Sequence, residues 1–339
     1  MSTIQAISYI LPEKIYSNEE FYADFPDAKE ANLEKVGVLK RHIVAPGQTA
    51  SDLAVLAAEK LFSEHQIDRN EIDFVLLVFM GPDYYMPSSS GIVHARLGLR
   101  SNCGALDMEI GCSGYGYALS VASGLIAVAG VKKVLILTSS TLTNTIHPKD
   151  RGSRFVFGDG AAATLVTSDD AGTMDSFVFG NDGAEFEKII VRAGGQRNPL
   201  TPESYAETTD EYGKVACDAN YFMDGIGVFQ FSVKRVPVLV ADILAKAGLE
   251  KDDVDLYVFH QPNVFLNETI RKKIGIPEDK FVHCFAQTGN TVQSTIPIAL
   301  YESIQNGRLK RGMKVLIAGF GVGLSWSGAI IKYLSRLEI

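Results

Sequence analysis

The sequence predicts an α/β protein made of two similar halves. Residues 62–78 and 244–260 both read as the end of a helix, an acidic turn, then Ile or Val, Asp and a continuous apolar run. Residues 133–136 recur at 314–317 with almost the same offset. Two distant matches at nearly one offset indicate an internal duplication. The chain has 339 residues, enough for two units of ordinary size, and we expect halves at 1–170 and 171–339.

The composition fits a globular protein and argues against several other classes. Apolar residues make up 46% of the chain, and a net charge of −8 does not suggest a nucleic-acid partner. The four cysteines are too scattered for a disulfide framework or a metal site. The first residues lack a basic segment followed by an apolar run, so we expect no signal peptide and a cytoplasmic protein.

The first half can be assigned element by element. We expect a strand at 3–10, an acidic and aromatic helix at 18–32 and a polar connection at 37–47. Residues 52–65 have apolar residues at helical spacing, with Ser51 or Asp52 as the cap. Residues 73–79 form a continuous apolar run, as a buried parallel strand does. We then expect a loop at 82–90, a short helix at 92–97, and strands at 105–109 and 133–138.

Residues 110–131 carry no charge and allow two interpretations. A run of that length is long enough to span a membrane. Five glycines and three serines lower its hydrophobicity, so we expect a tight turn and then a helix buried in a soluble core. Cys112 would lie at the N-terminal end of that helix, where unpaired N–H groups favour a thiolate over a thiol. For such a residue taken alone, an inert core cysteine is the alternative.

The duplication brings two more polar residues to the same place. His260 ends the apolar strand that corresponds to the strand ending at Val78. The turn at Cys112 corresponds to the loop 288–294, which contains Asn290. Ligands of open α/β sheets bind outside the carboxyl ends of the strands, so we expect these three residues to converge where the halves meet. Taken alone, His260 could be a structural histidine and Asn290 a turn former.

At these motifs the sequence resembles the β-ketoacyl-[acyl-carrier-protein] synthase III family of the thiolase-fold condensing enzymes. The resemblance runs from about residue 4 to 331. It rests on the Gly-Cys-Ser-Gly turn at 111–114, on 150–152 with 157–160, on His-Gln-Pro-Asn at 260–263, on 289–291 and on 319–321. It implies a thiolase-like α/β fold: two pseudo-duplicated βαβαβαββ halves that form a five-layered αβαβα core. It also implies a homodimer.

The resemblance implies a reaction and the residues that perform it. Cys112 would take an acyl group from a thioester. His260 and Asn290 would then act in malonyl decarboxylation and stabilise the enolate, which attacks the acyl group. The backbone N–H groups of Cys112 and Val322 would form the oxyanion hole, and Asn263 would support the catalytic side chains without contacting the substrate. The family implies no cofactor: acyl-CoA or acyl-carrier-protein thioesters are the substrates, in fatty-acid or specialised-metabolite biosynthesis.

Further contacts follow from the same resemblance. Arg151 and Phe320 would contact the substrate, and Met86 matches a position that reaches the partner subunit's acyl pocket. Lys272 and Lys273 would form a patch for the acyl carrier protein, although a solvated face is the alternative for a lysine pair.

Three departures from the family bear on the acyl donor. The family's priming enzymes carry a Trp near position 31 that stacks on the adenine of coenzyme A, and this chain has Ala31. Phe265 stands where an Arg is usual, and Gln230 stands where a Lys of the carrier patch is expected. We therefore expect weak coenzyme A binding and a preference for acyl groups carried on a protein.

Other functions must be weighed against condensation. The acyl group could pass from Cys112 to an oxygen or nitrogen nucleophile, but plain transfer does not need an enolate-stabilising pair such as His260 and Asn290. A Cys-His-Asn hydrolase shares the residue order but would carry a Cys-Gly-Ser-Cys-Trp type of signature, and the duplication argues against it. An inactive scaffold subunit would not need all three polar residues. The sequence therefore favours a decarboxylating, carbon–carbon bond-forming acyltransferase.

Overall fold

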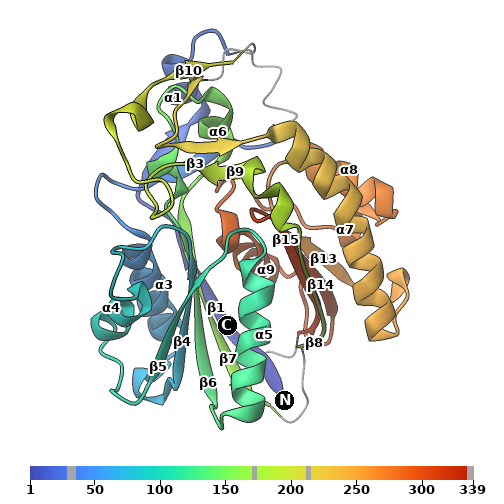
Figure 1. Cartoon of the computed structure of the whole chain (residues 1–339). Coiled ribbons are helices and arrows are strands. Elements are labelled where there is room, and N and C mark those ends of the chain that lie inside the picture. Colours follow the sequence, from blue (N-terminus) through green and yellow to red (C-terminus); the bar gives the residue numbers. More distant parts are fainter. Residues whose placement is uncertain (29–35, 170–173, 211–214, 334–339) are drawn as a thin grey trace.

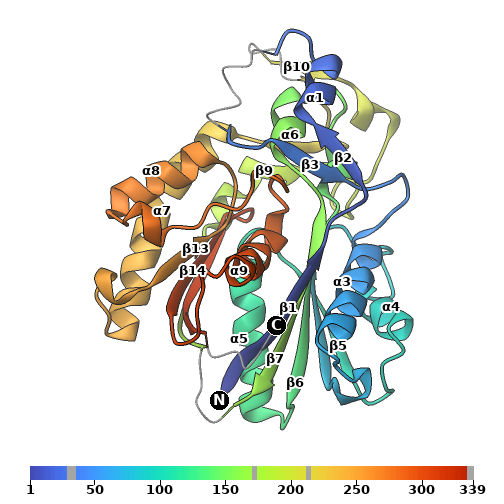
Figure 2. The ribbon, with the colours of Figure 1, turned by 180° about the vertical axis from the view of Figure 1, so that it is seen from behind.

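Five layers of helices and sheets make up the body of the protein (Figure 1). The computed structural model describes residues 1–28, 36–169, 174–210 and 215–333. One outer layer holds α3 (Ala50–Glu64) and α4 (Ser89–Arg96), and the other holds α7 (Gly225–Ala247) and α8 (Val264–Ile274). The middle layer holds α5 (Gly114–Val128) and α9 (Thr295–Gln305), which lie between the two sheets (Figure 2).

The first sheet has five strands in the order β1-β7-β6-β4-β5. Their bounds are β1 (Ser2–Ile10), β4 (Phe74–Phe79), β5 (Gly104–Glu109), β6 (Lys133–Ser140) and β7 (Gly160–Ser168). β4 runs parallel to both of its neighbours, whereas β7 is antiparallel to β1 and β6. All but the first residue of β4 are buried, because helices cover both faces of this sheet, as the unbroken apolar run predicts.

The second sheet has four strands in the order β13-β14-β15-β8. Their bounds are β8 (Met174–Asn181), β13 (Leu256–Phe259), β14 (Lys314–Gly321) and β15 (Ser325–Lys332). The strand expected between α8 and α9 is reduced to a single bridge between Tyr257 and Phe281. The second half thus departs from the full βαβαβαββ order by one strand. The sheets use residues 2–168 and 174–332, while the domain limits at 1–170 and 171–339 stay a prediction.

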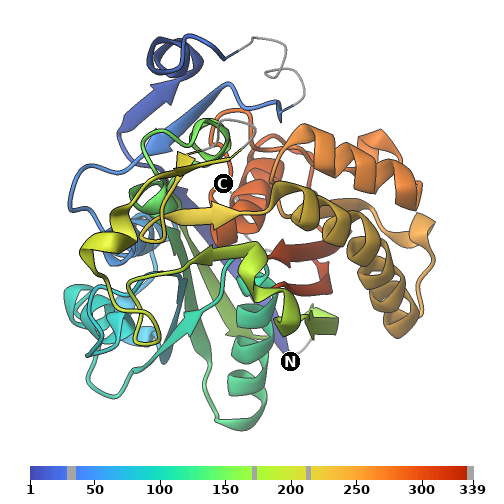
Figure 3. The same ribbon diagram turned by 45° about the horizontal axis from the view of Figure 1, so that its top comes forward.

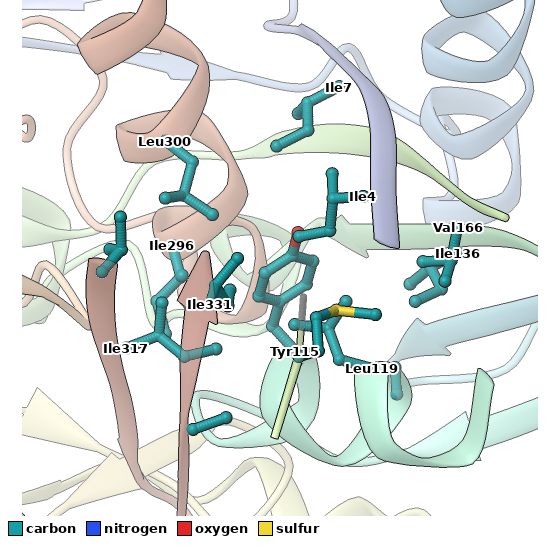
Figure 4. Close-up of a cluster of buried hydrophobic side chains, with 14 of the residues drawn as sticks. Ile4, Ile7, Tyr115, Leu119, Ile136, Val166, Ile296, Leu300, Ile317 and Ile331 are labelled. Carbon is teal, nitrogen blue, oxygen red and sulfur yellow. The ribbon is translucent and has the colours of Figure 1, made fainter. Parts of the chain in front are cut away.

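The two halves repeat each other around a shared core. α5 and β6 in the first half correspond to α9 and β14 in the second. Side chains from both sheets and both middle helices meet in one buried cluster, in which Tyr115 and Leu119 of α5 lie near Ile296 of α9 and Ile317 of β14 (Figure 4). Since the cluster draws on both halves, neither half can bury its inner face alone.

A cap of short elements covers the end of the body at which α5 begins (Figure 3). It contains β2 (Lys14–Ser17), α1 (Asn18–Asp24), β3 (Lys40–Ile43), α6 (Arg151–Val156), β9 (Ile189–Val191), β10 (Thr208–Thr209), β11 (Val215–Ala216) and β12 (Tyr221–Met223). The offset between the two halves becomes smaller after about residue 143, which indicates an insertion near 143–154 in the first half, and α6 begins within that segment. The cap therefore places non-repeated residues over the junction of the halves.

Two predictions about the cap are wrong. The helix expected at 18–32 ends at Asp24, because Phe25 precedes Pro26 and a residue before proline disfavours helical angles; residues 29–32 lie outside the described residues. The segment 37–47 contains strand β3, and its Arg41 is fully buried. The guanidinium carbon of Arg41 lies 5.0, 5.5 and 5.1 Å from the ring centroids of Tyr16, Phe21 and Phe155. These rings surround the guanidinium in place of the water that would solvate it in an exposed connection.

Two helix starts also differ from the predictions. The cap of α3 is Thr49, and Asp52 closes the capping box from the third helical position by accepting the N–H of Thr49 at 2.8 Å. α4 begins at Ser89, three residues before the first apolar residue of its pattern. In both cases the polar first turn precedes the periodic apolar residues, which carry the signal that sequence analysis detects.

The uncharged stretch at 110–131 forms helix α5 within the middle layer. No helix in the described part of the chain combines the length and the apolar character that crossing a bilayer requires. Tyr115, Ala118, Leu119 and Ala122 of α5 belong to the buried cluster shared by both halves, as expected for a core helix.

Candidate active site

Cys112 occupies the turn between the end of β5 at Glu109 and the start of α5 at Gly114. The backbone N–H groups of Val322 and of Cys112 itself both point at its Sγ. The β14–β15 loop comes so close that a Cβ on Gly321 would lie 2.7 Å from Sγ. Glycine at this position therefore allows the two backbone donors and the sulfur to share one small space.

The thiol of Cys112 is not activated in the way the sequence suggested. Burial raises its pKa to about 12, and the two backbone donors, which act in the opposite direction, do not offset this. The expected position at a helix N-terminus is correct, but the expected depressed pKa is not. In this enclosed state Cys112 is a thiol at neutral pH.

His260 follows β13 directly, and its ring is buried between the halves. Its Nδ1 lies 2.8 Å from the hydroxyl oxygen of Thr295, the first residue of α9. Burial lowers the pKa of His260 to about 3, while the backbone carbonyl of Val292 acts weakly in the opposite direction. The imidazole is therefore neutral across the physiological pH range.

Asn290 lies in the loop before α9, and both its backbone and its side chain are fixed. Its backbone N–H donates to the carbonyl oxygen of Val156 at 2.9 Å, and its carbonyl oxygen accepts the N–H of Gly158 at 3.1 Å. Its Oδ1 accepts the N–H of Val292 at 2.9 Å. Within the described residues Nδ2 has no hydrogen-bond partner, so the amide presents two N–H donors away from the loop.

Val292 connects these three residues, and no sequence motif pointed to it. Its side chain packs in one buried cluster with Cys112, its N–H holds Asn290, and its carbonyl faces the ring of His260. Its φ is +55°, a left-handed value that is unfavourable for a β-branched residue. Strain of this kind persists where the surroundings over-determine the backbone, often at functional sites.

A second group that sequence analysis missed surrounds the sulfur. Cys112, Ile146, Phe157, Tyr221 and Val292 form a buried apolar cluster, with Leu142, Val156, Ile189 and Met223 at its margin. The hydroxyl of Tyr221 donates to the thioether of Met223 at 3.4 Å, a weak acceptor. Burial raises the pKa of Tyr221 well above its usual value, so the phenol stays neutral. A residue on the short strand β12 carries no motif by which its neighbourhood could be predicted.

A cavity of about 480 Å³ lies between the cap and the start of α8. It is lined by Phe21, Tyr22, Ala28, Val36, Arg151, Gly152, Phe155, Val156, Asn263 and Phe265. Arg151 contributes the only cationic side chain among these lining residues. Val156 belongs both to this lining and to the margin of the cluster around Cys112, so the cavity borders the site.

The structure places the other predicted residues as follows. Asn263 caps α8 by accepting the N–H of Leu266 at 2.9 Å, and the hydrogen bond to the carbonyl of His260 comes from Asn267 instead. Phe320 is buried with its ring against that of His260. Met86 is 83% exposed on a loop.

Lys272 and Lys273 are exposed near the C-terminal end of α8. Lys272 lies two helical turns beyond Phe265, about 10 Å along the axis. Its Nζ is 3.9 Å from Glu268, which also binds Arg271. The lysine pair thus lies on the helix that begins at the cavity.

Family models and known relatives agree along the chain. Residues 106–183 match the model described as 3-oxoacyl-[acyl-carrier-protein] synthase III, and residues 244–333 match the model of its C-terminal part. β-Ketoacyl-[acyl-carrier-protein] synthase III of Streptococcus equi subsp. zooepidemicus is 32% identical over 98% of this chain and 99% of its own. The enzyme of the same name from Xanthomonas euvesicatoria pv. vesicatoria is 32% identical over 98% of each chain.

Solved structures show the same similarity. A crystal structure of a 3-oxoacyl-(acyl-carrier-protein) synthase III superposes with a TM-score of 0.96 at 40% identity, covering 98% of this chain and 99% of the other. The priming β-ketosynthase of a polyketide biosynthetic pathway superposes with a TM-score of 0.86 at 27% identity, covering 99% and 97%. The thiolase-like fold that the sequence resemblance implied is confirmed.

Proposed function

The chain belongs to the 3-oxoacyl-[acyl-carrier-protein] synthase III family, and from this premise we propose how its residues perform the reaction. It is an acyl-thioester condensing enzyme that joins an acyl group to a malonyl thioester. The observation that carries the assignment of residues is the convergence of a thiol, two backbone N–H donors and a separately held amide where the two halves meet.

The first step loads the acyl group onto Cys112. Its sulfur bonds to the carbonyl carbon of the acyl thioester, and the donor's sulfur leaves with the proton that the thiol gives up. Negative charge develops on the carbonyl oxygen during the attack. The N–H groups of Cys112 and Val322 supply fixed donors for that charge, which compensates for a thiol whose pKa burial keeps high.

The second step uses the neutral residues of the other half. The carbon–carbon bond to the malonyl carboxylate breaks, CO₂ leaves, and the electron pair becomes an enolate. Nδ2 of Asn290 and Nε2 of His260 donate to the enolate oxygen. The enolate carbon then attacks the acyl carbonyl, and the sulfur of Cys112 leaves as a thiolate that takes a proton from water. Transfer to an oxygen or nitrogen nucleophile would leave Asn290 and His260 without a function.

The role of His260 requires a particular tautomer. The hydroxyl of Thr295 has one proton and two neighbours that can accept it, Nδ1 of His260 at 2.8 Å and the carbonyl of Val292 at 2.9 Å. When the proton goes to Nδ1, the ring proton is on Nε2 and can be donated to the enolate. In the other tautomer Nε2 would be a proton acceptor. In the structure the hydroxyl donates to the carbonyl of Val292, so the proposed reaction requires it to turn its proton to Nδ1.

The residues that line the cavity and the charges on α8 support a carrier-bound acyl donor. Its lining is mostly apolar, and at its edge Phe265, 55% exposed, stacks on Phe229 with ring centroids 5.4 Å apart. Stacked phenylalanines cannot pair with phosphates as an arginine does. Lys272 and Lys273, farther along α8, provide positive charge for an acidic carrier surface.

The edge of the first sheet supports a homodimer. β5 is its outermost strand, so one side of it offers unpaired backbone groups. Leu106 on that strand is 46% exposed, and Tyr84, Tyr85 and Met86 of a nearby loop are 64%, 73% and 83% exposed. Apolar residues around an open strand edge mark an interface. Leu106→Asp should lower the mass measured by light scattering to that of a monomer, whereas Leu56→Asp, at a similarly exposed residue on α3, should not.

One experiment tests the function as a whole. The protein is incubated with an acyl thioester and a malonyl thioester, and mass spectrometry follows acyl-enzyme, CO₂ and product. Condensation gives a β-ketoacyl product two carbons longer than the acyl group and one CO₂ for each product. If acyl-enzyme forms but the acyl group is passed to added amines or alcohols without CO₂ release, the proposal is wrong.

A further inference from the structure

Three buried serine hydroxyls connect the Cys112 turn to the loop that carries Val322. The hydroxyls of Ser113 and Ser325 lie 2.7 Å apart. The hydroxyl of Ser325 donates to the carbonyl of Val322 at 2.7 Å, and that of Ser327 donates to the carbonyl of Ser113 at 2.6 Å. Ser113 belongs to the first half and the other two to the second, so these bonds cross the junction.

The position of every proton in this chain of bonds is determined. A serine hydroxyl has one proton, and a carbonyl can only accept. Ser325 must use its proton on Val322, so Ser113 must be the donor to Ser325. Ser327 uses its own proton on the carbonyl of Ser113. The three hydroxyls therefore form a directed series with no free proton.

The local structure explains why these serines meet. Ser325 and Ser327 alternate with Trp326 on β15, so both face the middle layer while Trp326 packs beneath Arg235 of α7 at 4.4 Å. Ser113 is in the N-cap position of α5, where a serine usually binds the backbone N–H groups of the first turn. It makes no such bond, because its hydroxyl is directed to Ser325 instead.

These hydrogen bonds and the backbone between them form a closed ring that includes the sulfur of Cys112. Ser113 adjoins Cys112, and Ser325 holds the carbonyl of Val322, whose N–H points at the sulfur of Cys112. The backbones on the two sides are in close contact: a Cβ on Gly319 would lie 2.7 Å from the carbonyl oxygen of Cys112. A shift of either segment would therefore change the distance between the sulfur and the N–H of Val322.

We propose that Ser325 is a positioning residue, which together with Ser113 fixes the Val322 N–H against the sulfur of Cys112. This inference rests on the proposed function, because it concerns the oxyanion donors of the acylation step. Ser325 acts through Val322 and touches neither substrate nor sulfur in this scheme. It sets the geometry in which the N–H stabilises both the thiolate and the charge on the acyl oxygen.

The test compares Ser325→Ala with Ser325→Thr, which keeps a hydroxyl. Ser232→Ala is the matched control, because Ser232 is also fully buried and also donates to a backbone carbonyl at 2.7 Å, that of Val228, far from the sulfur. Two quantities are measured: the rate of iodoacetamide alkylation at Cys112 over a series of pH values near neutrality, located by peptide mass spectrometry, and the acylation rate at several donor concentrations. Thermal unfolding reports the fold of each variant.

Ser325→Ala should lower the alkylation rate at each pH, because less thiolate is present, and slow maximal acylation about 10- to 100-fold with KM unchanged, as displaced catalytic groups do. Ser325→Thr should restore both quantities, and Ser232→Ala should match the wild type. Identical behaviour of Ser325→Ala and Ser232→Ala would overturn the inference. If Ser325→Ala does not fold, Ser113→Ala removes the preceding donor and must shift the same two quantities.

The alkylation readout separates this inference from the proposed function. It needs no thioester, so it reports on the ring even if Cys112 proves not to be acylated by any donor. In that case the proposed function fails, and a lowered alkylation rate in Ser325→Ala still establishes the positioning role.

Discussion

The ring of Phe320 meets the ring of His260 nearly at a right angle, with centroids 5.6 Å apart and planes inclined by 87°. Phe320 is part of the same strand that leads to Val322, so one segment both covers the histidine and supplies a donor to the sulfur. The apolar ring excludes water from the imidazole, and this burial disfavours the charged form.

The first prediction concerns stability at low pH. His260 has a pKa of about 3 in the folded protein and about 6.5 in the unfolded chain, so the unfolded chain binds the extra proton as the pH falls below 6.5. Each pH unit between these values should remove about 1.4 kcal/mol of stability. The melting temperature of His260→Asn minus that of the wild type should therefore increase as the pH falls from 6.5 towards 4.

The comparison with His260→Asn is needed because Asp159 acts in the opposite direction. Burial raises the pKa of Asp159 to about 6, so the folded protein takes up this proton more readily than the unfolded chain. The wild type and His260→Asn share the contribution of Asp159, so it cancels in the difference between their melting temperatures. A difference in melting temperature that does not change with pH would show that His260 is not buried as described.

The second prediction identifies the acylated residue. Cys112→Ala should form no acyl adduct with any thioester, while its melting temperature stays close to that of the wild type. Intact-protein mass spectrometry measures the adduct. Cys103→Ala is the control, because Cys103 is similarly buried but lies before β5, and it should acylate normally. A stable adduct on Cys112→Ala would refute the assignment.

The third prediction separates the two half-reactions. His260→Ala and Asn290→Ala each remove one donor to the enolate oxygen, and loss of such a donor typically costs about 10²–10³ in rate. Release of CO₂ from a malonyl thioester should fall by that factor in each variant, and acylation of Cys112 should change much less. Wild-type CO₂ release in both variants would contradict the enolate role.

The fourth prediction concerns the donor. For one acyl chain, kcat/KM should be higher for the carrier-bound form than for acyl-CoA. Phe265→Arg should raise kcat/KM for acyl-CoA, since an arginine can pair with phosphate, and Phe265→Ala should not. A clear preference of the wild type for acyl-CoA would show that Arg151 or Arg154 contacts the nucleotide instead.

The fifth prediction concerns the acyl group. Tyr221 lies in the apolar cluster around Cys112, so Tyr221→Ala should leave room beside the sulfur for a longer chain. Selectivity should move towards longer acyl groups by about tenfold per methylene. Tyr221→Phe keeps the ring and should retain the wild-type chain preference. Equal selectivity of all three proteins would place the acyl group elsewhere.

The sequence was informative where chemistry follows from a repeated pattern. The duplication predicted that Cys112, His260 and Asn290 lie at corresponding ends of helices and strands, and the structure brings all three around Val292. It could not reveal the left-handed backbone of Val292, because no local signal requires that conformation of a β-branched residue. Asn290 and Thr295 hold the backbone of Val292, and its side chain packs in one cluster with Cys112 of the other half.

The electrostatic environment of buried side chains was the other feature that could not be predicted from the sequence. A cysteine before a helix predicts a low thiol pKa, but that argument omits the burial that the other half imposes on Cys112. Arg41 shows the same limitation, since a charged residue in a polar stretch proved fully buried among three aromatic rings. Burial depends on partners distant in sequence, so these two environments could not be predicted locally.

The order of strands in the second sheet has a consequence for synthesis on the ribosome. β8 lies at the sheet edge beside β15, with Asn181 opposite Ser325, and β15 is the last strand of the described chain to be made. At a synthesis rate of roughly 5–20 residues per second, β15 is made about 7–30 s after β8. During that time the nascent chain exposes an unpaired strand carrying Phe177 and Phe179, which favours aggregation. A message that stops before Ser325 would leave β8 without a partner permanently, so truncated products should be cleared by proteases rather than accumulate as folded protein.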